Sequence, residues 1–330
     1  MKKDNKDLCC NKTSIGGQAL IEGIMMQNPN GTAAISVRCP DGTIDTEEIE
    51  VKHVRDKFKF LGWPMLRGVV NYIESMIFGY KCLMISAEKS GLEDMEESEE
   101  NMSKLDKWLN DHLNKKVMGV LTAAASVIGV GLAFLLFFYL PTVIVDFINK
   151  LAGESLDNFR ALFEGIIRMA IFVLYIAAVS LMKDIKRTFM YHGAEHKTIF
   201  CYEKGLDLTV ENVKKQSRFH PRCGTSFIFV IIIISVIISS ALSIFTDLRD
   251  NTLLWMIAKI MILPLVTGLS YEFIRYAGKH DNAFVKVLAA PGLWMQRLTT
   301  KEPDDSMIEV ALEAFKAVIP KEDKEDSVDE

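Results

Sequence analysis

Residues 191–197 read Tyr-His-Gly-Ala-Glu-His-Lys and place two histidines and a glutamate at helical spacing. On a helix, His192 and His196 lie one turn apart on the same face, so both imidazoles could bind one metal ion. Glu195, beside them, could accept a proton from a water molecule at that metal. The order His-x-x-Glu-His is that of the inverzincin metallopeptidases. These residues therefore predict a metal site in which Glu195 is the catalytic base.

A second group of candidate ligands follows in the sequence His-Pro-Arg-Cys-Gly-Thr, residues 220–225. Imidazole and thiolate are both good Zn²⁺ ligands, so His220 and Cys223 could complete a four-ligand set with His192 and His196. A closed set of four would make the metal structural, whereas one ligand off the metal would leave room for a reacting water. We expect a divalent metal, for which Zn²⁺ is the best match.

The same residues also allow a metal-free interpretation. His192 and Glu195 could hydrogen-bond to each other, and His196 could stack at the lipid interface. Cys223 would then be a small buried residue.

Three further polar residues are weaker candidates for the same site. Glu272 lies far from His196 in sequence, but the predicted spans return it to the same side of the membrane. Gln18 and Glu22 lie among apolar residues and could mark the outward face of a strand, or Glu22 could reach the site. His53 and His112 stand alone in the sequence and are expected on solvated surfaces, whereas His280, in Gly-Lys-His-Asp-Asn beyond the last predicted span, is a weaker candidate.

Two long uncharged runs indicate that membrane-spanning helices position these residues. A helix crosses the hydrocarbon core with about 20 mostly apolar residues. Residues 117–145 and residues 226–246 contain no charged side chain. Each run predicts one span.

Two further runs are less purely apolar. Residues 161–182 carry Glu164 and Arg168 near their start, where such charges can snorkel to the interface. Residues 253–271 contain Lys259 and a proline. With these two, the chain is predicted to have about four spans arranged as two hairpins.

The distribution of basic residues orients these spans. Lysines and arginines are concentrated in residues 183–225, and others precede the first span and follow the last. By the positive-inside rule, both termini and residues 183–225 face the cytoplasm.

The flanking segments have distinct patterns. Residues 17–52 hold short β-prone runs separated by Asn-Pro-Asn-Gly and Pro-Asp-Gly, which predict a β-meander. Residues 63–87 have helical periodicity and are predicted to lie on the membrane or pack against the bundle, with a fifth membrane element as the third option. The acidic run at 93–100 is a solvated linker. Residues 304–318 predict an amphipathic helix with an acidic N-terminus.

The predicted fold is therefore mainly α: a polytopic membrane helical bundle with a small N-terminal cytoplasmic β-meander. It divides into a β-meander (1–60), an amphipathic helix and acidic linker (61–115), a first transmembrane hairpin (116–182), the His/Glu/Cys segment (183–225), a second transmembrane hairpin (226–271), and an interfacial helix with an acidic tail (272–330).

Composition excludes several classes of protein. The 330 residues have a net charge of −5, and the basic residues form no stripe interleaved with aromatics, so no nucleic-acid partner is expected. The six cysteines lie mostly in segments assigned to the cytosol, where we expect them to stay reduced. Transport is disfavoured because only Lys259 stands out as polar within the spans and no internal repeat is visible.

Four motifs together resemble a known family. Gly-Gly-Gln-Ala-Leu-Ile-Glu-Gly-Ile-Met-Met-Gln, Tyr-His-Gly-Ala-Glu-His-Lys-Thr-Ile-Phe-Cys-Tyr-Glu, His-Pro-Arg-Cys-Gly-Thr-Ser-Phe and Ala-Pro-Gly-Leu-Trp-Met-Gln-Arg-Leu occur in this order. They resemble the bacterial membrane-protein family named after YqhQ, over about residues 14–318. The resemblance implies a metal-dependent protein of the bacterial cytoplasmic membrane with no established substrate. It implicates the residues already named: His192, Glu195, His196, His220 and Cys223, with Gln18 and Glu22 less directly.

Two functions are consistent with these features. The first is a metal-dependent hydrolase that acts at the membrane interface on a lipid headgroup or a membrane protein or peptide. The second is a non-catalytic membrane scaffold or regulatory protein whose His/Cys cluster is structural.

Overall fold

The computed structural model describes residues 13–91, 115–153, 155–156, 159–246, 248, 251–280 and 282–319. Several features predicted from the sequence lie outside the described residues: the acidic run at 93–100, the C-terminal tail, Cys9, Cys10 and His112.

The N-terminal β-meander is a four-stranded antiparallel sheet with strands in sequence order: β1 (Gly16–Leu20), β2 (Gly23–Gln27), β3 (Thr32–Arg38) and β4 (Ile44–Glu50). It has one strand more than the three β-prone runs in the sequence. The first run folds back on itself at a tight turn, where Glu22 adopts φ 49°. Glu22 is therefore a turn residue, and not part of the outward face of a strand. The other two turns contain Gly31 and Gly42, both with positive φ, as the glycine-containing breakers predict.

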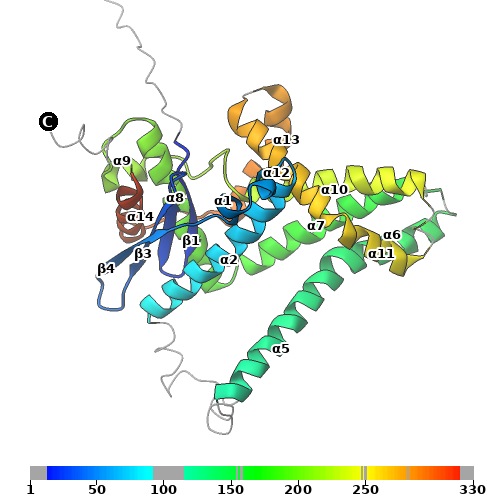
Figure 1. Cartoon of the computed structure of the whole chain (residues 1–330), viewed down its shortest axis with the longest axis horizontal. Helices are drawn as coiled ribbons and strands as arrows, with labels where there is room; N and C mark the ends of the chain where they lie inside the picture. Colours follow the sequence, from blue (N-terminus) through cyan, green and yellow to red (C-terminus); the bar gives the residue numbers. More distant parts are fainter. Residues whose placement is uncertain are drawn as a thin grey trace, which may run out of the picture.

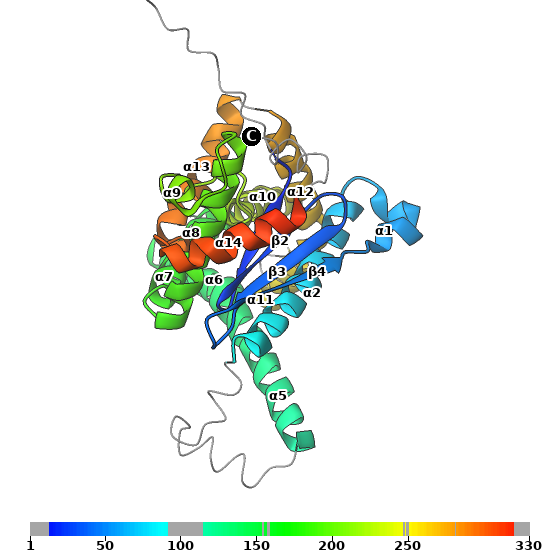
Figure 2. The same ribbon diagram turned by 90° about the vertical axis from the view of Figure 1, so that its left-hand side faces the viewer.

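The sheet is the middle layer of three. It is covered by α2 (Leu66–Lys89) on one face and by α8 (Lys183–Glu203) and α14 (Asp305–Val318) on the other. Successive side chains of a strand point to opposite faces. Accordingly, Ile24 and Met26 pack in the core with α8 and α14, whereas Met25 between them packs with Cys82 of α2. Figures 1 and 2 show α14 crossing one face of the sheet while α2 runs behind the other.

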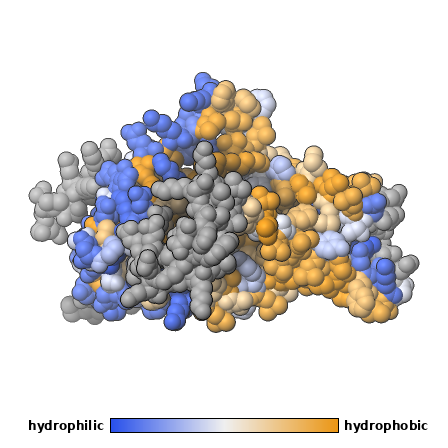
Figure 3. All heavy atoms as spheres, turned by 90° about the horizontal axis from the view of Figure 1, so that it is seen from below, coloured by the Kyte–Doolittle hydropathy of each residue, from blue (hydrophilic) through white to orange (hydrophobic). Residues whose placement is uncertain are grey.

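Three helices of the described residues are long and apolar enough to cross a membrane: Ala124–Leu151, Arg160–Val179 and Phe227–Phe245. The first comprises α5 (Lys115–Phe134), a π-helical segment (Leu135–Tyr139) and α6 (Leu140–Leu151); the others are α7 (Arg160–Val179) and α10 (Thr225–Phe245). In Figure 3 hydrophobic residues gather over this end of the molecule, away from the largely hydrophilic end that contains the sheet.

The fourth predicted span is a bent pair of helices, α11 (Thr252–Met261) and α12 (Leu263–Lys279). Their axes differ by 42°, so the described residues have three candidate spans, or four if this bent pair is counted as one. Pro264 lies in the first turn of α12. Proline has no backbone N–H and disfavours helical geometry in the residue before it, which explains the break.

Three charged residues of the predicted spans are buried inside the helix bundle: Glu164, Arg168 and Lys259. Glu164 and Lys259 form an ion pair with each side chain 3% exposed, and Arg168 is 8% exposed. Arg168 donates from Nε to the carbonyl of Phe137 and from Nη1 to Ser235. The prediction that Glu164 and Arg168 snorkel to the interface is therefore wrong, because protein partners satisfy them within the bundle.

Helix α2 also joins the sheet to the bundle. Gly68 packs so closely on α12 that an added Cβ would lie 2.7 Å from Cβ of Tyr271. Asn71 donates to the hydroxyl of Tyr271 at 2.7 Å. The remaining described helices are α1 (Val54–Lys57), a 3₁₀ turn (Lys59–Gly62), α9 (Val210–Lys214) and α13 (Ala283–Thr299).

Candidate metal centre

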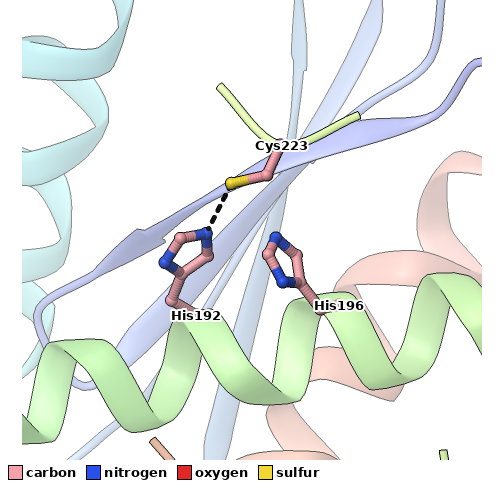
Figure 4. Close-up of side chains that lie close together, drawn as sticks. All are labelled: His192, His196 and Cys223. Carbon is pink, nitrogen blue, oxygen red and sulfur yellow. Dashed lines mark hydrogen bonds between the residues drawn. The ribbon is translucent and has the colours of Figure 1, made fainter. Parts of the chain in front are cut away.

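Two histidines and a cysteine meet between α8 and the loop that precedes α10. Nε2 of His192 lies 3.2 Å from Sγ of Cys223, and the rings of His192 and His196 are 4.4 Å apart. One ligand atom from each of the three residues lies within 4.8 Å of the other two. Figure 4 shows both imidazoles rising from the same face of α8 with the thiol opposite them. This His/Cys triad could hold a metal ion.

Hydrogen bonds to backbone carbonyls fix the orientation and the tautomer of both imidazole rings. Nδ1 of His192 lies 2.8 Å from the carbonyl oxygen of Thr299, and Nδ1 of His196 lies 2.6 Å from that of Arg218. A carbonyl only accepts hydrogen bonds, so each Nδ1 carries the proton and each Nε2 presents a lone pair. Metal-binding histidines are oriented by such an outer hydrogen bond.

The triad fits the chemistry of a zinc ion. Zn–N and Zn–S bonds of about 2.0–2.3 Å place neighbouring tetrahedral ligands about 3.3–3.6 Å apart, so the three donor atoms need only small adjustments. Burial lowers the pKa of His196, although Cys223 works against that effect, and a lowered pKa favours the neutral ring that a metal ligand must have. Two imidazole nitrogens and one thiolate are a donor set that Zn²⁺ favours.

Glu195 is buried beside the triad, in the wall of the same cavity of about 640 Å³. Its Oε2 has no hydrogen-bond partner within the described part of the chain. Burial raises the pKa of Glu195, an effect that nearby His192 and the backbone N–H of Gly17 only partly offset. Gly17 must be a glycine for this approach, because a Cβ there would meet Glu195 Cδ at 3.0 Å and the β2 backbone more closely.

His220 lines the cavity but is not a member of the triad. Its ring centre lies 5.6 Å from that of His196. The buried amide of Gln296 holds its backbone, accepting from the N–H of His220 and donating to its carbonyl, both at 2.7 Å. Nε2 of His220 lies 3.7 Å from the carboxylate of Glu203 and has no hydrogen-bond partner within the described residues.

The three weaker candidates are separated by the fold. Gln18 lines the cavity from β1. Glu22 instead binds Arg187 and accepts from the hydroxyl of Tyr191 at 3.1 Å. Both carboxylate oxygens of Glu272 accept hydrogen bonds from Arg67 of α2, at 2.5 and 2.6 Å, and Glu272 does not join the triad.

The other two described histidines lie outside the cavity lining. Nδ1 of His53 lies 2.8 Å from the carboxylate of Glu74. His280 stacks on Tyr276.

Several residues that position the triad could not be predicted from the spacing of the ligand residues in the sequence. Thr299 and Arg218 act through their carbonyls, which any residue type could supply. Gln296, within the last family-like motif, is fully buried and could have been suspected as a polar residue in an apolar run. Gly193 contacts the backbone of Lys301, which brings the segment after α13 against α8.

Comparison with known proteins identifies the family. The family described as "Protein of unknown function (DUF1385)" matches residues 63–321. The chain belongs to this family. It is also 36% identical, over 308 residues, to the uncharacterised protein YqhQ of Bacillus subtilis (strain 168), with 92% of each chain covered. The resemblance inferred from the four motifs is thus confirmed. No solved structure matches.

Proposed function

We propose that this family member is a metal-dependent hydrolase acting at the membrane interface, with Zn²⁺ held by His192, His196 and Cys223. The main support for this proposal is that the triad and the unpartnered carboxylate of Glu195 line one cavity. Three protein ligands leave a position of the tetrahedral ion for a reactant, as in catalytic zinc sites.

A zinc ion in this position would lower the pKa of a bound water to about 7. The residues of the chain transfer the proton and orient the metal ligands. Glu195 holds and moves the proton at Oε2, and its raised pKa brings it nearer the working pH, where a general base is most effective. The backbone N–H of Gly17 interacts with the same carboxylate. The carbonyls of Thr299 and Arg218 keep both histidine ligands in the required tautomer.

The apolar face of α2 supports a location at the membrane surface. Large side chains at helical spacing are exposed on it: Ile73, Met76, Ile77, Tyr80 and Met84. The opposite face is buried against the sheet and α12. An exposed stripe of this kind is typical of a helix lying in the interface plane, and α2 packs on α12, the second half of the bent pair.

Spin labels can test this placement of α2. A label at Ile77→Cys should be reached by lipid-soluble oxygen, whereas one at the exposed Glu88→Cys should be reached by a water-soluble nickel complex. Equal exposure of both labels to the nickel complex would contradict the placement.

The location in the bacterial cytoplasmic membrane, with both termini and residues 183–225 in the cytoplasm, rests on the distribution of basic residues. Reporter fusions at both ends and in the connection before α11 test it. A periplasmic signal from either terminus would contradict the orientation.

Metal analysis of the purified protein tests the proposed site. The wild type should contain one zinc per chain, and His192→Ala, His196→Ala and Cys223→Ala should each lose it. Cys201→Ala is the matched control, since this buried cysteine lies on the same helix but not in the triad. Wild-type protein prepared without chelator that contains no stoichiometric metal would refute the site.

Glu195→Gln tests the hydrolase. It should retain zinc but lose hydrolysis in a screen of phospholipid and peptide substrates presented in nanodiscs. Full activity in this variant would remove Glu195 from the mechanism.

The alternative is a non-catalytic membrane scaffold in which the metal is structural. It is favoured by the position of Cys223, which would fasten the loop before α10 to α8. In that case Glu195→Gln would have no phenotype in a strain that lacks the native protein, whereas each ligand variant would lower the unfolding temperature.

A further inference from the structure

We infer that His220, Arg222 and Arg275 form an oxyanion-binding subsite beside the triad, and that the substrate carries a phosphoryl group. This inference rests on the proposed function in one respect: the bound anion is a substrate only if the protein is a hydrolase. The binding of the anion itself can be measured independently of hydrolysis.

The hydrogen bonds of His220 give it the opposite tautomer from the two histidine ligands. Its Nδ1 accepts from the backbone N–H of Arg222 at 3.3 Å. In the neutral ring Nδ1 therefore carries the lone pair and Nε2 carries the proton. His220 thus presents an N–H donor where His192 and His196 present metal-binding lone pairs.

This donor is buried without an acceptor. The side chain of His220 is 6% exposed and lines the cavity. The nearest carboxylate oxygen, on Glu203, is 3.7 Å away, beyond hydrogen-bond distance. The other oxygen of Glu203 already accepts from the N–H of Thr13 and from Arg222. A buried donor without a partner is unfavourable, and an oxyanion in the cavity would satisfy it.

Two arginines add positive charge to the same cavity. Arg222 uses one nitrogen to bind Glu203, which leaves its other N–H groups available. Arg275 is exposed and makes no salt bridge in the described part of the chain, since Glu272 is held by Arg67. Glu195 is the only carboxylate among the described residues that line the cavity. The cavity therefore favours an anion.

The donors favour a phosphoryl group over a carboxylate. Two guanidinium groups and an imidazole N–H exceed what one carboxylate with a single charge needs, whereas a phosphate offers more oxygens and more charge. Arg275 belongs to α12, the second half of the bent span, which brings the subsite to the edge of the bundle. Apolar side chains also line the cavity, among them Ile15, Phe189 and Ile199. A phosphoryl group on an apolar molecule and free phosphate would both satisfy the donors.

Calorimetric titration of the full chain in neutral phosphatidylcholine nanodiscs tests the subsite with three probes: inorganic phosphate, a short-chain phosphatidic acid and acetate. Arg275→Gln and His220→Phe should each weaken binding of the phosphate probes at least tenfold. Arg297→Gln, an exposed arginine of α13 outside the cavity, should leave it unchanged. His220→Gln, which keeps an N–H donor, should restore part of the affinity.

Comparison of the probes identifies the source of the anion. Tighter binding of the phosphatidic acid indicates a lipid substrate, and equal binding indicates a soluble phosphate compound; both support the subsite. Acetate binding as tightly as phosphate, or unchanged affinity in both Arg275→Gln and His220→Phe, would overturn it. So would loss of zinc in His220→Phe, since His220 would then be a ligand. Phosphate binding by protein that contains no metal would leave the subsite intact and refute only the hydrolase.

Discussion

The buried ion pair between Glu164 and Lys259 makes the fold sensitive to a single change of charge. Glu164 also accepts from the indole of Trp255 at 3.3 Å, and Lys259 donates to Thr142 at 3.0 Å. Arg168 is near enough to interact electrostatically with the same carboxylate. One carboxylate therefore compensates two buried cations.

Removing that carboxylate should cost more than removing either cation. Glu164→Gln leaves Lys259 and Arg168 buried without a counter-charge, which we expect to cost about 3–5 kcal/mol of unfolding free energy. Lys259→Met leaves Glu164 opposite Arg168 and should cost about 2 kcal/mol less. The double variant should be no less stable than Glu164→Gln, which corresponds to a coupling energy of about 1–3 kcal/mol.

Reversible denaturation by sodium dodecyl sulfate in mixed micelles measures these differences, and the fluorescence of Trp255 within the cluster reports on it directly. Lys150→Met, at an exposed lysine of α6, is the control and should change stability by less than about 0.5 kcal/mol. If Glu164→Gln is as stable as the control, or if the effects of the two single changes are additive, the ion pair does not stabilise the bundle.

Three further predictions concern the part of the protein around the sheet. Gly193→Ala would drive a Cβ into the carbonyl of Lys301, so it should lower stability by about 1–3 kcal/mol and weaken metal binding. Gly129→Ala, which has open space around it, should do neither. Thermal unfolding and the zinc content of both variants test this. Burial alone would raise the pKa of Glu203, but its histidine and arginine neighbours outweigh burial and the net pKa lies below the ordinary value. The stability that Glu203 contributes should therefore be complete above about pH 4.3 and lost as pH falls through the lower folded-state pKa, and an unchanged acid limb in Glu203→Gln would contradict this. Burial raises the pKa of Cys201 to about 11, so iodoacetamide at neutral pH should not label it in the folded protein, as mass spectrometry of the labelled peptides would show.

The candidate membrane-spanning helices could be predicted from the sequence because they depend on local composition. Uncharged runs long enough to cross a bilayer are visible without any contact information, and three of the four predicted spans correspond to continuous helices. The bend before α12 could have been predicted from Pro264. The burial of Glu164 and Arg168 could not, because it depends on Lys259 and Ser235, which lie on other helices.

In the N-terminal sheet, too, local sequence predicts some features and tertiary contacts determine the others. Breaker residues mark two of its three turns, but the first turn, between Leu20 and Gly23, has no glycine or proline at its centre, so the sequence does not predict it. One face of the sheet is covered by α8 and α14, which are distant in sequence from the strands, and the other face is covered by α2. The tertiary structure alone showed that this sheet brings Gly17 and Gln18 to the cavity wall.

The sequence by itself determined that His192 and His196 share one helix face, because a helical repeat fixes the neighbours of each residue. It also supplied Glu195 and Cys223 as partners of the right chemistry. Only the tertiary structure decided which residues meet. It brought Cys223 to the two histidines, left His220 in the cavity wall, and paired Glu272 with Arg67 and Glu22 with Arg187. It also set the tautomers of the histidines through the carbonyls of Thr299 and Arg218 and the N–H of Arg222. The physical reason is that a proton position depends on the atom opposite each ring nitrogen, and in this protein that atom is a backbone group whose identity no side-chain pattern records.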